Sequence, residues 1–77
     1  MTIQEVKDYI EKDLEGAKRC NYSEPDFVMA RSLGVVLFAM QYIESAEDRQ
    51  ALTEWWDCEE RGKFEEFKKE RKNAGTY

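Results

Sequence analysis

The 77-residue sequence has no histidine and only two cysteines, which removes the usual ligands for metal ions. Carboxylate di-metal bundles need Glu-x-x-His pairs, and two distant cysteines supply only half of a four-ligand zinc site. The sequence also has no glycine-rich phosphate loop and no serine with an evident base. We therefore predict no metal, no cofactor and no catalytic residue, so the protein is not expected to be an enzyme.

Proline and glycine are also scarce, with one proline and four glycines. This scarcity favours helices, because these two residues interrupt helices most often. Hydrophobic residues make up 42% of the chain and aromatic residues 13%, which is typical of a folded chain rather than a disordered one. Residues 1–77 are expected to form a single domain, near the lower size at which one core supports a fold.

Long hydrophobic segments are missing too. The apolar run from Val35 to Met40 is too short for a membrane span, which takes about 20 residues, and no basic stretch precedes an apolar one at the start, so we expect no signal peptide. The net charge of -5 opposes direct binding to nucleic acid or to a membrane. We expect a cytoplasmic protein whose Cys20 and Cys58 form no disulfide, because their predicted positions lie too far apart.

Helix-start signals divide the sequence into three helices. Thr2-Ile-Gln-Glu5 has the form of a capping box and predicts a helix to about residue 18 or 19. Ser23-Glu-Pro-Asp26 combines a capping hydroxyl with proline and acids, and predicts a second helix from about residue 24 to 44. Ser45 then predicts a corner and a third helix, although one continuous helix through this point is the alternative.

The apolar pattern of the third helix changes near Glu59, which projects into the same arc as Leu52 and Trp55. Gly62 is a typical helix C-terminal residue. An unbroken helix to Lys72 would be about 40 Å long, so we expect either a break at Gly62, with a short fourth helix after it, or a projecting end. Residues 73–77 are expected to form a frayed tail.

The second helix is apolar all round, and a helix of this kind must be covered on every side. Two flanking helices cover only part of it, so the predicted fold is an all-α three-helix bundle that packs as a homodimer. A monomer remains the alternative, with the first helix and a folded-back C-terminal segment enclosing the second. The residues expected to mediate self-association are Leu33, Val35, Val36, Met40, Tyr42 and Ile43.

The third helix carries a second candidate surface. Residues 44–60 contain seven acids against one base, Arg49, whereas residues 61–72 contain six bases against three acids. Tryptophan is common among residues that dominate binding energy, so this region is expected to contact an unidentified protein partner. The predicted partner-binding residues are Trp55, Trp56, Asp57, Glu59 and Glu60.

These patterns predict a small, acidic, non-catalytic protein-interaction or regulatory module that self-associates through its apolar central helix. The alternative is an acidic inhibitor of the phage or mobile-element type. Its acids would imitate a phosphate row and block a nucleic-acid-binding protein through charge complementarity.

Overall fold

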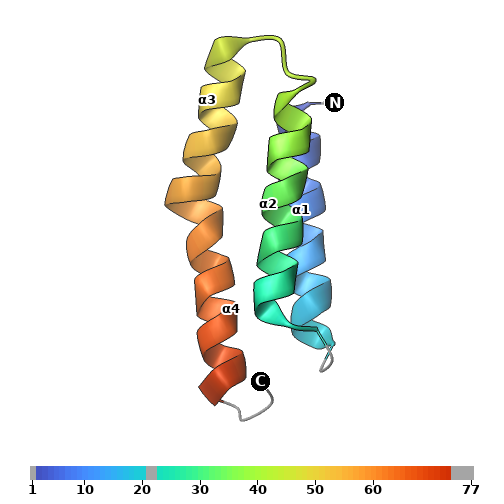
Figure 1. The fold of residues 1–77 in the computed structure, drawn as a ribbon, viewed down its shortest axis with the longest axis vertical. Helices are drawn as coiled ribbons and strands as arrows, with labels where there is room; N and C mark the ends of the chain where they lie inside the picture. Colours follow the sequence, from blue (N-terminus) through green and yellow to red (C-terminus); the bar gives the residue numbers. More distant parts are fainter. Residues whose placement is uncertain (1, 21–22, 74–77) are drawn as a thin grey trace.

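Three long helices form the protein in a computed structural model that describes residues 2–20 and 23–73. They consist of α1 (Ile3–Arg19), α2 (Pro25–Met40) and a rod made of α3 (Ala46–Trp55), the π-helical turn η1 (Trp56–Glu60) and α4 (Arg61–Asn73). Each runs antiparallel to the one before it (Figure 1), in a bundle measuring 43 × 19 × 15 Å. The all-α three-helix prediction is confirmed.

The first helix begins as its capping signal predicts. The backbone N–H of Glu5 donates to the Thr2 hydroxyl, and the backbone N–H of Thr2 donates to the Glu5 carboxylate. These two bonds satisfy donors that a helix start otherwise leaves free. One stripe of α1 is buried, formed by Val6, Ile10, Leu14 and Ala17.

The second helix begins close to its predicted start but ends earlier than predicted. Its N-cap is Glu24, with no side-chain capping bond, so the prediction that Ser23 caps the helix is wrong. The helix ends at Met40, four residues before the predicted end. Gln41 and Tyr42 then form a turn, and their N–H groups bond to carbonyls only three residues back.

The corner between α2 and α3 lies where the sequence places it. Ser45 is the N-cap of α3, and its hydroxyl accepts from the backbone N–H of Asp48 at 3.3 Å. Arg49 reaches back and donates to the carbonyls of Ile43 and Glu44 at 2.6 and 2.9 Å. This base therefore holds the α2–α3 connection against the first turn of α3.

The rod does not break at Gly62, contrary to prediction. Instead the backbone N–H of Arg61 bonds to the carbonyl of Trp56, five residues back, in the π-helical turn. At about 100° per residue, an uninterrupted α-helix would turn Phe64 about 120° away from Leu52. The extra residue of a π turn reverses most of that rotation, so Leu52 and Phe64 are both buried in one core.

The end of the rod does not project freely either. Arg71 is buried and donates to the carbonyls of Ala17, Cys20 and Ser23 at 2.8–3.2 Å, while its guanidinium stacks 4.9 Å from the centre of the Phe67 ring. The last turn of α4 is thus fastened to the α1–α2 connection. Asn73, placed in the predicted tail, is the last helical residue, and residues 74–77 lie outside the described part.

Candidate interaction surface

One side of α2 is apolar and exposed to solvent. We call it the α2 face and define it by Phe27, Ala30, Leu33, Gly34, Leu37, Phe38 and Tyr42, which are all exposed. Their spacing of three and four residues makes the face continuous along the helix. The exposed fractions of its four largest contributors are 63% for Phe27, 59% for Leu37, 53% for Phe38 and 61% for Tyr42.

This surface is as large as the largest apolar patch of a typical monomer. Taking about 200 Å² for a fully exposed large side chain, these four residues alone present about 450 Å². Soluble monomers rarely expose a continuous apolar patch of more than a few hundred Å², and such patches are often functional. The patch is uncovered because α1 and the rod both pack on the opposite side of α2. That side is buried through Val28, Ser32, Val36 and Ala39.

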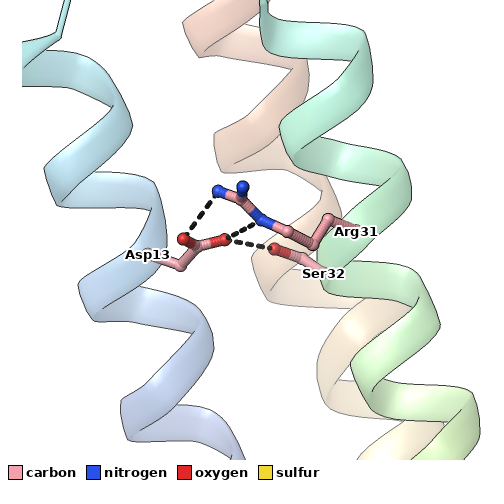
Figure 2. A network of polar contacts seen from close by, with 3 residues as sticks. All are labelled: Asp13, Arg31 and Ser32. Atoms are coloured by element: carbon pink, nitrogen blue, oxygen red, sulfur yellow. Dashed lines mark hydrogen bonds and ion pairs between the residues drawn. The ribbon is translucent and has the colours of Figure 1, made fainter. Parts of the chain in front are cut away.

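A polar network fixes how α2 is rotated against α1. Figure 2 shows Asp13 of α1 reaching across to Arg31 and Ser32 of α2. The guanidinium of Arg31 donates to both carboxylate oxygens of Asp13, at 2.7 and 3.1 Å, and the Ser32 hydroxyl lies 3.5 Å from the same carboxylate. A fork-to-carboxylate pair of this kind has a strict geometry. Together with the buried side chains of α2, it therefore specifies which side of α2 faces α1 and which remains outside.

The same network neutralises the one charged side chain beside the α2 face. Arg31 is the only charged residue between positions 27 and 43, and Asp13 neutralises it. Its guanidinium also lies 5.6 Å from the centre of the Phe27 ring. The rings of Phe38 and Tyr42, one turn apart, are tilted by 52° with centres 5.1 Å apart. The α2 face consequently offers aromatic rings without an unpaired charge.

A shallow groove continues this surface toward α1. Glu5, Val6, Tyr9 and Val35 line it, and Tyr9 is exposed while Val6 is buried. The groove gives the surface a second wall. A partner helix on α2 would therefore meet side chains of two helices.

The residues predicted to mediate self-association divide into three groups. Leu33 and Tyr42 are exposed, and Val35 and Met40 are half-buried. Val36 and Ile43 are buried in the core of the single chain, so these two are corrected: they face inward and cannot touch a second copy. The exposed side of α2 instead includes Phe27, Leu37 and Phe38, which the prediction omitted.

The tryptophans are a second correction. Both Trp55 and Trp56 are buried, because the π turn begins between them and brings both rings to the core. The ring centre of Trp56 lies 5.4 Å from that of Phe64, and Lys7 lies over the Trp55 ring at 5.6 Å. Neither tryptophan is available to anchor a partner on the surface of this chain.

The predicted acidic residues also separate. Asp57 and Glu59 are exposed, whereas Glu60 is fully buried and is the third correction. Its carboxylate oxygens have no hydrogen-bond partner among the described residues. Lys63 Nζ lies 3.7 Å from Glu60 and 3.9 Å from Glu11. Burial raises the pKa of Glu60, and the nearby charge of Lys63 opposes that rise.

Other sites have less support within residues 2–20 and 23–73. No group of three or more potential ligands there is arranged to hold a metal ion. None of the described helices has both the length and the apolar character to cross a bilayer. Cys20 and Cys58 are both exposed and are not joined in a disulfide. The α2 face thus remains the strongest candidate surface.

Comparison with known proteins assigns no relative, because no family model, curated protein or solved structure matches this chain.

Proposed function

We propose that the protein is a non-catalytic protein-interaction module that self-associates through the α2 face. The observation that supports this is the exposure of four large apolar side chains on one side of one helix. Burying them in a second molecule removes that surface from water, which is the main favourable term in association. A chain of this size has a small core, and oligomerisation is a common supplement to it.

The charge pattern favours this proposal over the acidic inhibitor. Exposed acids cluster on α3 and η1, but Arg61, Lys63, Lys69 and Lys72 follow on the same rod. The mainly acidic stretch from Glu44 to Glu59 therefore covers about 22 Å at 1.5 Å per residue. Beyond it the exposed acids of α4 are interspersed with these bases, whereas a mimic of a long phosphate row requires a row of acids without bases between them.

Light scattering coupled to size exclusion tests the proposal. A dimer of the 9.2 kDa chain is expected at micromolar concentration, with dissociation on dilution. Leu37→Glu places a charge in the α2 face and should weaken the dimer at least 30-fold, because removing a central interface side chain costs about 2 kcal/mol or more. A mass of one chain at every concentration would refute the proposal.

Ala51→Glu is the matched control. Ala51 is also exposed on a helix, but it lies on α3. The Ala51→Glu substitution adds the same charge away from the α2 face and should leave the dimer unchanged. Equal effects of the two substitutions would mean that net charge, and not the α2 face, governs association.

A further inference from the structure

The middle of the α2 face is occupied by small residues. Gly34 lies halfway between Phe27 and Tyr42, and a Cβ added to it would meet nothing within 4 Å. Ala30, one turn earlier, is also exposed. Bulky side chains lie on both sides of this pair. The side chains of the face therefore project least at the point where a second helix would cross it. A glycine at that point permits a close approach of the two backbones.

The arrangement of large and small residues distinguishes two orientations. If two copies cross antiparallel at Gly34, residues equally far before and after it face each other, so Phe38 of one copy meets Ala30 of the other. Phe27 then meets Gln41, and the aliphatic part of Arg31 meets Leu37. In a parallel pair each residue meets its own copy, which sets Phe38 against Phe38 and leaves a gap at Ala30. Close packing favours the antiparallel pair.

Charge along the bundle favours the same orientation. Residues 41–60, beside the C-terminal end of α2, contain seven acids and one base, whereas residues 61–73, beside its N-terminal end, contain six bases and three acids. The long axis therefore has an acidic and a basic end. An antiparallel pair brings opposite ends together, and a parallel pair brings like ends together. Complementary potentials of this kind determine orientation more than affinity.

We infer that the occupant of the α2 face is a second copy of this chain, packed antiparallel about a two-fold axis at Gly34. This inference rests on the proposed function, because it requires that the α2 face self-associates. Such an interface is isologous, with the same surface on both copies. Its size also fits, because about 450 Å² from four side chains, together with their neighbours and the groove beside Tyr9, approaches the roughly 800 Å² per partner of a standard interface.

Distances between spin labels on single-cysteine variants test the orientation. In a chain with Cys20→Ser and Cys58→Ser, Glu24→Cys and Gln41→Cys each provide one exposed attachment point. Glu24 precedes α2 and alone distinguishes the two orientations, whereas Gln41 lies opposite Phe27 in the antiparallel pair, so its label is used only where light scattering shows that the labelled chain still dimerises. Antiparallel packing places two Glu24→Cys labels about 30 Å apart along the axis, and two Gln41→Cys labels about 21 Å apart. Parallel packing places both pairs side by side, about 10 Å apart.

In a mixture of the two variants, the antiparallel pair gives the short distance between labels and the parallel pair gives the long one. One copy labelled at position 24 and another at position 41 are then offset by about 5 Å along the axis if antiparallel, and by about 25 Å if parallel. Circular dichroism and light scattering on the same samples confirm helix content and mass. Short same-site distances within a dimer would overturn the orientation and leave the proposed function standing, whereas loss of the dimer in the unmodified chain would overturn both.

Discussion

Replacing the buried acid of the π turn should make the protein more stable at neutral pH. Glu60 is fully buried, and neither carboxylate oxygen has a hydrogen-bond partner among the described residues. Methionine has a similar length and helix propensity but no group that needs such a partner. Glu60→Met therefore removes the polar atoms while keeping most of the packing volume.

The magnitude follows from two opposing terms. Leaving a buried polar group without a hydrogen bond costs about 1–3 kcal/mol. The ion pair with Lys63 returns part of this cost, but Lys63 is about half exposed, and pairs that involve solvent-exposed charges contribute at most about 1 kcal/mol. The free energy of unfolding of Glu60→Met should therefore exceed that of the original chain by about 1–2 kcal/mol at pH 7.

The pH dependence has a definite sign. Burial raises the pKa of Glu60 above its ordinary value of 4.5, while Lys63 lowers it and Glu11 and Glu59 raise it. The folded state thus keeps this proton to a higher pH than the unfolded state. The contribution of Glu60 to stability is complete below pH 4.5 and is lost as the pH rises through the folded-state pKa. The advantage of Glu60→Met should grow from pH 4 to pH 7.

Urea unfolding at pH 4, 5, 6 and 7, at one protein concentration, measures this difference. Glu59→Met is the matched control, because Glu59 precedes Glu60 in the same turn but is exposed. It should change the free energy of unfolding by less than about 0.5 kcal/mol. A loss of stability in Glu60→Met at pH 7, or an advantage that does not vary with pH, would refute the reasoning.

Three further predictions concern a crossing point, an anchor and a cap. Gly34→Ala should stabilise the single chain by about 1 kcal/mol through helix propensity yet weaken the dimer. Gly16→Ala is the control, because Gly16 is also helical with open space around it, and it should stabilise the chain without weakening the dimer. Thermal unfolding measures the stability, and light scattering measures the dimer. Arg71→Met should lower the unfolding free energy by about 3 kcal/mol, because charged hydrogen bonds to three carbonyls are lost, and Arg71→Lys should lose less. Thr2→Ala should cost about 1 kcal/mol in urea unfolding.

Local signals in the sequence predicted local structure well. The capping residues of α1 and α3 contact backbone groups only three residues away, so their effect depends little on the rest of the chain. Ser23 failed as a cap although it has the right side chain. Its backbone carbonyl instead accepts from Arg71, 48 residues later in the chain. A contact of that range cannot be predicted from the four residues around Ser23.

The π turn was only partly predictable from the sequence around it. The sequence indicates a change near Glu59, and Gly62 is the residue at which a break is expected, because glycine often ends helices. A rotation of the rod satisfies the same need, since it returns Phe64 and Phe67 to the core without ending the helix. Which solution applies depends on the position of α1 and α2 beside the rod, and that information is tertiary.

The uncovered side of α2 was predicted to exist, but its direction was not. A helix that is apolar all round has no preferred side in its own pattern. Its direction is set by the packing of α2 against α1 and the rod, together with the pair that Arg31 forms with Asp13 of α1. The apolar pattern alone therefore does not separate Val36 and Ile43, which are buried, from Phe27, which is exposed and precedes the long apolar run.

The anchoring of Arg71 has a consequence for the order in which the chain folds. Its three carbonyl acceptors lie 48–54 residues earlier in the sequence, so they are synthesised long before the guanidinium that binds them. Helical turns form locally and fast, whereas contacts over such separations close large loops and form late. The hydrogen bonds that Arg71 makes to the α1–α2 connection therefore form after the helices themselves, and a chain that terminates before residue 71 would keep most of its helices but lack these three bonds.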